Sequence, residues 1–270
     1  MNPIGVFDSG IGGLTVLKAL TDELPSESFV YFGDTARVPY GTKSEPVVKQ
    51  FALQDSLFLL KHDVKLIVVA CNSASSVALD FLKQRLALPV IGVIKPGAEA
   101  ALDAAPDKPI GIIGTRATIA SGAYQRALKS LKPDIEFTAQ PCPLFVPLVE
   151  EGLTAGEIPK VVVEHYLHPL KEAGIGALIL GCTHYPLLKS IIAEYFGDEV
   201  IIIDSAAATA QKVKAELAVR GMLADEETSR SINFFASDIS PGFVEQSRLF
   251  FGGELPQVEK VEFEVADFWV

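Results

Sequence analysis

The sequence predicts an α/β protein built from two similar, pseudo-symmetric lobes, each a mostly parallel sheet flanked by helices. Short apolar runs of strand length alternate with longer stretches of helix length through the 270 residues, an order typical of parallel sheets with crossover helices. The order then starts again, because PIGIIGT at 109–115 repeats the pattern of PIGVFDS at 3–9. We therefore expect a duplicated domain with a functional site in the cleft between the lobes.

The elements of the first repeat follow from where its apolar runs begin and end. Each strand is a short apolar run bounded by glycine, proline or polar residues. The predicted strands are 4–7, 29–32, 66–70 and 90–94. The predicted helices are 14–23, about 44–62, and 73–86. Pro89 and Pro96 are taken as the boundaries of the last strand.

The second repeat has the same order, with extra residues in the loop at 141–156. Its predicted strands are 109–114, 135–140, 178–180 and 200–203, and a long helix is predicted at about 158–173. The tail is expected to contain a helix near 211–221, a strand at 232–235 and a helix at 241–251, and to fold back onto the first lobe. We therefore expect the first lobe to comprise residues 1–97 and 210–270, and the second lobe residues 98–209.

Composition and charge restrict the class of protein. The formal net charge of −11 disfavours a nucleic-acid partner, because nucleic-acid affinity depends largely on lysine and arginine side chains that neutralise phosphates. Proline, glycine or charge interrupts every apolar stretch before it reaches membrane-spanning length, so we expect no membrane partner. The chain opens directly on a strand pattern, and its three cysteines make no disulfide framework. We therefore expect a cytoplasmic protein.

Two cysteines stand in closely similar settings, one in each repeat. Cys71 ends the apolar run KLIVVAC, and Cys182 ends the run ALILGC. Because ligands of open parallel sheets bind beyond the carboxyl ends of the strands, we expect both thiols at one cleft, on opposite sides. Each cysteine is also predicted at a helix N-terminus, which lowers the pKa of a thiol. A pair of such groups suits acid–base chemistry on two faces of one carbon.

Other interpretations of these residues stay open at the level of sequence. Cys182 and His184, with Cys71 as a third ligand, could form a zinc site, although no CxxC or HxxxH spacing is present. A cysteine–histidine hydrolase needs one nucleophile and leaves the second thiol unexplained. Cys142 has no counterpart in the repeat and is expected to be inert. The glycines at 10–13 match the dinucleotide-binding fingerprint only partly, and we expect their N–H groups to approach an anion instead.

Five motifs make the sequence similar to the glutamate racemase family over nearly its whole length. They are GVFDSGIGGLT at 5–15, GDTARVPYG at 33–41, ACNSAS at 70–75, GTRAT at 114–118 and GCTHYPLL at 181–188. One departure is Ser73, where many members have threonine; the hydroxyl remains, so the change concerns only fine packing. The resemblance implies interconversion of L- and D-glutamate for peptidoglycan synthesis, without pyridoxal phosphate, metal or another cofactor.

The resemblance also assigns roles to individual residues. It implies that Cys71 acts on the D-enantiomer and Cys182 on the L-enantiomer at Cα. The positions expected to support catalysis are Asp8, Asp34, Glu150 and His184. Taken one at a time, each of these could also be an ordinary polar loop residue. The positions expected to bind substrate are Asp8, Ser9, Pro39, Tyr40, Gly41, Asn72, Ser73, Thr115, Thr118, Thr183 and His184.

The resemblance further implies glutamate as the small-molecule partner and a homodimer as the assembly. No residue pattern alone requires glutamate, because aspartate racemase and related two-thiol isomerases use the same architecture. A non-enzymatic, two-lobed binding protein for small molecules is another alternative. The presence of both thiols argues against it.

Overall fold

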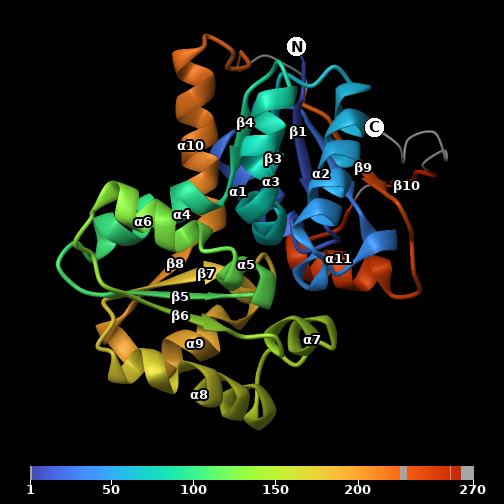
Figure 1. Ribbon diagram of the computed structural model, residues 1–270. Coiled ribbons are helices and arrows are strands. Elements are labelled where there is room, and N and C mark those ends of the chain that lie inside the picture. Colours follow the sequence, from blue (N-terminus) through green and yellow to red (C-terminus); the bar gives the residue numbers. More distant parts are fainter. Residues whose placement is uncertain (1, 226–229, 256, 263–270) are drawn as a thin grey trace.

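Two parallel sheets form the frame of the molecule in the computed structural model (Figure 1), which describes residues 2–225, 230–255 and 257–262. Across the first sheet the strands are β10 (Val258–Lys260), β9 (Ile232–Ala236), β2 (Phe29–Gly33), β1 (Ile4–Asp8), β3 (Leu66–Val69) and β4 (Val90–Gly92). Across the second they are β6 (Phe137–Pro141), β5 (Ile110–Gly114), β7 (Ala177–Gly181) and β8 (Ile201–Asp204). The order β2-β1-β3-β4 is repeated as β6-β5-β7-β8, and this confirms the two-lobed α/β fold.

The helices occupy the connections between strands, as crossovers of parallel strands require. In chain order the α-helices are α1 (Leu14–Glu23), α2 (Glu45–Leu60), α3 (Asn72–Arg85), α4 (Ile94–Ala104), α5 (Arg116–Ala120), α6 (Ala123–Leu131), α7 (Phe145–Glu150), α8 (Glu157–Glu172), α9 (Lys189–Phe196), α10 (Ser205–Val219) and α11 (Phe243–Phe251). Short 3-10 helices are Thr35–Arg37, Tyr40–Thr42, Tyr185–Leu188 and Gly197–Glu199. Within the described residues, no helix is long and apolar enough to cross a bilayer.

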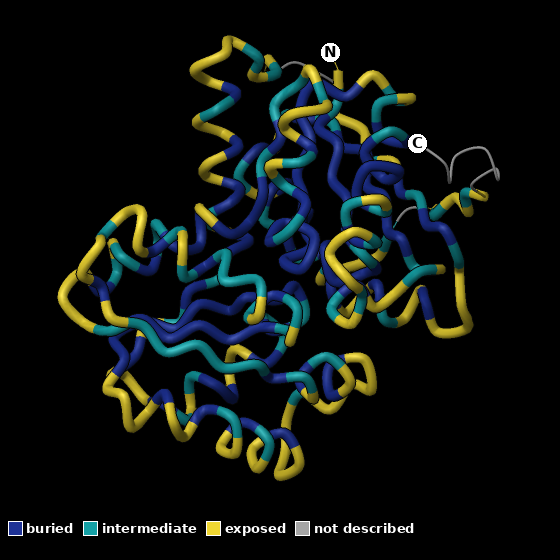
Figure 2. The backbone as a smooth tube through the Cα atoms, viewed as in Figure 1, coloured by how far each residue is buried: buried dark blue, intermediate teal, exposed yellow. Residues whose placement is uncertain are grey.

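The strands are apolar because helices cover both faces of each sheet, and Figure 2 shows the strands of both lobes as largely buried. Side chains of α2 and α3 pack on one face of the first sheet, and those of α4 and α6 on one face of the second. The remaining faces share a single apolar cluster, to which α1, α8, α9, α10 and α11 contribute. The hydrophobic core is therefore continuous from one lobe to the other.

The tail returns to the first lobe, as the sequence predicts. β9 pairs in parallel with β2, and β10 pairs with β9. α10, which follows the last strand of the second sheet, packs against α1 of the first lobe. The predicted lobe boundaries near residues 97 and 209 stay a prediction, and parts of the predicted first lobe (1, 226–229, 256 and 263–270) lie outside the described residues.

Some predicted elements were wrong. The strand predicted at 90–94 ends at Gly92, and α4 begins at Ile94, with Pro96 inside its first turn. Proline is tolerated there because the first backbone N–H groups of a helix have no intrahelical acceptor. The helix predicted near 211–221 begins earlier, at Ser205, where the Asp204 carboxylate accepts a hydrogen bond from the N–H of Ala206 at 2.9 Å. The helices α5, α6 and α7 were not predicted.

Candidate active site

A cavity of about 430 Å³ lies between the lobes, where strands of both sheets end. Its walls come from the segments that follow β1, β2, β3, β5 and β7, together with α7 and α11, in agreement with the rule for ligand sites in parallel sheets. The predicted site residues that line it are Ser9, Pro39, Tyr40, Gly41, Cys71, Asn72, Ser73, Thr115, Glu150, Cys182, Thr183 and His184. Both repeated cysteines therefore contribute to one cavity, each from its own lobe.

Cys71 lies at the N-cap of α3, directly after β3. Its Sγ donates a hydrogen bond to Oγ of Ser9 at 3.4 Å. Burial and the negative charge of Asp8 raise the pKa of the Cys71 thiol to about 12, although the hydrogen bonds with Ser9 and with the backbone of Ala74 act in the opposite direction. The predicted lowering of this pKa by the helix N-terminus was therefore wrong, because desolvation of the buried thiolate outweighs it.

Cys182 lies at the end of β7 but not at the N-terminus of an α-helix. The 3-10 helix that begins at Tyr185 follows it, and the first regular turn of α9 starts only at Lys189. The predicted helix N-terminus was therefore wrong for this cysteine. An imidazole lies beside the thiol instead, with Nδ1 of His184 3.9 Å from Sγ of Cys182.

The imidazole of His184 is held between both lobes. Its Nε2 lies 3.3 Å from Oε1 of Glu150 at the end of α7, and its ring packs edge to face on Phe250 of α11 with the ring centres 4.9 Å apart. Burial lowers the pKa of His184, but hydrogen bonds with Cys182 and Glu150, together with the charges of Cys182 and Asp8, raise it to about 10. The imidazole is therefore protonated at neutral pH.

Asp8 lies beneath the cavity and is not among the described residues that line it. Its side chain is fully buried, and Oδ2 accepts a hydrogen bond from the N–H of Gly10 at 3.0 Å. Oδ1 has no hydrogen-bond partner among the residues that the structure describes. Burial raises the pKa of Asp8, while His184 and the backbone N–H groups lower it. Its charge acts on Cys71, so the two thiols have different neighbours: a carboxylate for Cys71 and an imidazole for Cys182.

Asp34 also lies outside the cavity lining and belongs to a buried network behind one wall. It accepts hydrogen bonds from the hydroxyl of Tyr40, from Nε of Arg37 at 2.7 Å and from Oγ of Ser237 at 2.9 Å. Asp55 binds the same two residues, with Nη2 of Arg37 at 2.8 Å and the Tyr40 hydroxyl at 2.9 Å. The network fixes the segment that carries Pro39, Tyr40 and Gly41 into the wall of the cavity.

Three hydroxyls meet across the lobes at the start of α3 and α5. Oγ of Ser73 lies 3.1 Å from Oγ1 of Thr115 and 3.3 Å from Oγ1 of Thr118, and the two threonine oxygens are 3.0 Å apart. Thr115 caps α5 by accepting a hydrogen bond from the N–H of Thr118. Thr118 is fully buried and supports the other two hydroxyls rather than lining the cavity.

Several lining residues were not named as catalytic or substrate-binding residues, although the glycines at 10–13 were expected to approach an anion. They are Gly10, Ile11, Thr35, Val38, Thr42, Arg116, Pro143, Val146, Pro147, Ser240, Phe243 and Gln246. Arg116 lies inside the quoted GTRAT motif, so a search of that motif for cationic side chains would have found it. The residues of α11 could not be found in this way, because they reach the cavity only through the pairing of β9 with β2.

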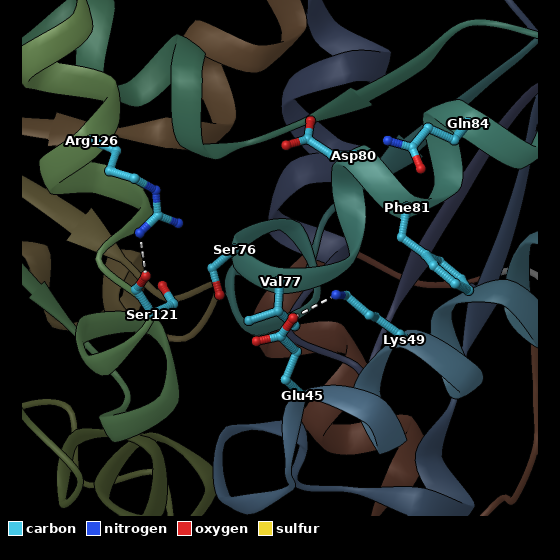
Figure 3. Close-up of a pocket in the computed structure, with 9 residues that line it drawn as sticks. All are labelled: Glu45, Lys49, Ser76, Val77, Asp80, Phe81, Gln84, Ser121 and Arg126. Atoms are coloured by element: carbon cyan, nitrogen blue, oxygen red, sulfur yellow. Dashed lines mark hydrogen bonds and ion pairs between the residues drawn. The ribbon is translucent and has the colours of Figure 1, made fainter.

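A second cavity, of about 360 Å³, lies between α2, α3 and the segment that leads from α5 to α6 (Figure 3). Its lining is mostly polar and includes the Lys49–Glu45 ion pair at 2.5 Å and Arg126, which donates a hydrogen bond to the carbonyl of Ser121 at 2.7 Å. None of the predicted site residues is among the described residues that line it. In the described part of the chain, no group of three or more histidine, cysteine and acidic side chains is placed to hold a metal ion.

A two-lobed α/β fold with a thiol from each lobe in one cavity defines a class of small-molecule enzyme. Comparison with known proteins identifies the family. Residues 12–213 match the Asp/Glu/Hydantoin racemase family. A glutamate racemase of Geobacter metallireducens is 48% identical over 97% of this chain and 97% of its own length.

Two solved structures are similar over the whole fold. The glutamate racemase of Francisella tularensis, solved in complex with D-glutamate, has a TM-score of 0.90 and 40% identity, and covers 97% of each chain. A glutamate racemase of Bacillus anthracis has a TM-score of 0.93 and 39% identity, also over 97% of each chain. The chain therefore belongs to the Asp/Glu/Hydantoin racemase family and is an isomerase of the racemase class.

Proposed function

We propose that the protein interconverts L- and D-glutamate through Cys71 and Cys182, without a cofactor. The observation that carries the proposal is that thiols from opposite lobes line one cavity. The similarity to glutamate racemases over nearly the whole chain supports the choice of substrate. Inversion at Cα requires an acid and a base on its two faces, and a pair of thiols supplies both.

In the proposed reaction one thiol group removes the proton from Cα and the other returns a proton to it. For L-glutamate, the thiolate of Cys182 takes the proton from Cα, and the thiol of Cys71 gives a proton to the opposite face. The C–H bond that breaks is replaced by one new C–H bond, and the thiol and the thiolate exchange places. Burial keeps Cys71 a thiol in the resting state, and Nδ1 of His184 lies 3.9 Å from the sulfur of Cys182. For D-glutamate the roles are reversed.

The polar groups of the lining suit a substrate with carboxylates. The N-terminus of α3 directs backbone N–H groups toward the cavity beside Asn72 and Ser73. The hydroxyls of Ser9, Thr115 and Thr183 add donors, and Arg116 adds a positive charge in a protein whose net charge is −11. We propose that these groups hold the two carboxylates of glutamate while Cα lies between the thiols.

Racemisation in deuterated water tests the function and the substrate together. With L-glutamate we expect D-glutamate that carries deuterium at Cα, because the proton returned to carbon comes from a thiol that exchanges with solvent. With L-aspartate we expect neither product nor exchange. Exchange and inversion of aspartate alone would identify an aspartate racemase, and no exchange with either amino acid would favour a binding protein.

The close approach of the lobes at Gly12 gives a second test. A Cβ at this position would lie 2.3 Å from Oγ1 of Thr183 and 2.6 Å from Nδ1 of His184. Gly12→Ala should therefore displace this segment and lower kcat/KM for glutamate about a hundredfold, measured by steady-state racemisation. Gly253→Ala is the matched control, since a Cβ there meets nothing within 4 Å. Wild-type kinetics in Gly12→Ala would show that the contact does not constrain the site.

We further propose that the protein acts in the cytoplasm as a homodimer and supplies D-glutamate for peptidoglycan. Similarity to glutamate racemases supports the D-glutamate part of this proposal. Sedimentation of the purified protein at several concentrations reports the assembly. A single monomeric species at all concentrations would contradict the homodimer.

A further inference from the structure

α11 belongs to the first lobe but contacts the second at the cavity. It follows β9 of the first sheet and packs against α1. Figure 1 shows it on the side of the first lobe that faces α7. Nε2 of Gln246 donates a hydrogen bond to the carbonyl of Glu150 at 3.3 Å, and the ring of Phe250 packs on the imidazole of His184. Two side chains of one helix therefore contact His184, which lies beside the Cys182 thiol, and Glu150, which lies beside His184.

We propose that Phe250 is a positioning residue for the imidazole of His184, and that Gln246 supports it by fixing the end of α7. This inference rests on the proposed function, in which His184 acts beside Cys182. Neither α11 residue touches the reacting atoms. They act through the imidazole and only when the two lobes are together.

The polar contacts of His184 are too loose to set the orientation of its ring. Nε2 lies 3.3 Å from a glutamate carboxylate whose side chain is 47% exposed. Nδ1 lies 3.4 Å from Oγ1 of Thr183 and 3.9 Å from the sulfur of Cys182. Exposed ion pairs hold side chains weakly. Phe250 is only 4% exposed, and its ring plane is inclined by 72° to that of the imidazole. Edge-to-face packing of this kind restricts how the imidazole can turn.

The titratable groups that act on His184 come from three elements. Cys182 lies in the same loop, Glu150 ends α7, and Asp8 ends β1, while the contact from α11 is the uncharged ring of Phe250. Burial lowers the pKa of His184, and the three partners together raise it above its ordinary value of 6.5 to about 10. If the ring turned away, it would lose both its desolvation and its partners. The net effect would be a lower pKa, because the partners outweigh the desolvation.

Phe250→Leu tests the inference in the full-length protein. The four histidines are labelled, and the His184 signal is assigned by its loss in His184→Asn and followed by NMR as the pH is raised. We expect the titration midpoint of His184 to fall by about one pH unit or more. We also expect kcat/KM for glutamate to fall about tenfold. Leu249→Ala, at an exposed position of the same helix, should leave both quantities unchanged.

An unchanged midpoint in a folded Phe250→Leu protein would overturn the inference. If that variant does not fold, Gln246→Ala carries the test, with a smaller fall of the same sign expected and no fall contradicting the proposal. Activity and titration are independent measurements. A wild-type protein that does not racemise glutamate would refute the proposed function, while the titration would still decide whether Phe250 positions His184.

Discussion

Replacement of either thiol, in Cys71→Ser or Cys182→Ser, is expected to lower kcat for glutamate racemisation by about 10²- to 10⁴-fold in both directions. Each thiol serves as the base in one direction and as the acid in the other, so the loss of either blocks both. A serine hydroxyl keeps the size but is far too weak an acid to form the required base at neutral pH. Circular dichroism of glutamate measures the rate. Full activity in either variant would refute the two-thiol mechanism.

The same variants can show which thiol meets which enantiomer. In deuterated water, the Cys182→Ser protein retains Cys71 and should exchange the α-proton of D-glutamate only. The Cys71→Ser protein should exchange that of L-glutamate only. Cys142→Ala is the matched control, because Cys142 is a buried cysteine outside the cavity lining. Its racemisation should equal that of the wild type.

Asp34→Ala is expected to lower the free energy of unfolding by about 3–5 kcal/mol. The substitution removes one of two fully buried carboxylates that bind Arg37, whose side chain is 13% exposed. It also removes acceptors from the hydroxyls of Tyr40 and Ser237. Unfolding in urea measures the loss, because the extrapolated free energy reports stability directly.

The control for Asp34→Ala is Asp22→Ala. Asp22 forms an ion pair with Lys18 on the surface, where the side chains are 62% and 43% exposed. Exposed pairs of this kind contribute less than about 1 kcal/mol. A loss of similar size in the two variants would mean that the buried network does not stabilise the wall of the cavity formed by Pro39, Tyr40 and Gly41.

The sequence predicts the inner strands β1, β2, β3, β5 and β7 well because they are buried throughout. Runs such as those at β3 and β7 are apolar throughout, and their ends are found to within two residues. α4 was missed because Pro96 suggests a break, whereas it lies in the first turn of a helix. The contribution of α11 could not be predicted, since it depends on the pairing of β9 with β2 across some two hundred residues of chain.

The sequence allows the residues of the candidate site to be predicted, but not the pKa shifts of its titratable groups. The two cysteines end similar strands, and strand ends of parallel sheets converge, so their shared cavity follows from the sequence. The direction of the pKa shift at Cys71 does not, because it depends on burial and on the nearby charge of Asp8. Asp34 illustrates the same limit: its place after β2 suggests a cavity residue, and only the fold reveals its partners Arg37 and Tyr40.

The unlike surroundings of the two thiols have a kinetic consequence for a reaction between mirror images. The equilibrium constant between enantiomers is unity, so kcat/KM must be equal in both directions, whatever the neighbours of each thiol. Asp8 acts on Cys71, whereas His184 lies beside Cys182. This difference can make kcat differ between the two directions only if KM differs by the same factor. The enantiomer that turns over faster at saturation must therefore be the one that saturates the enzyme at the higher concentration.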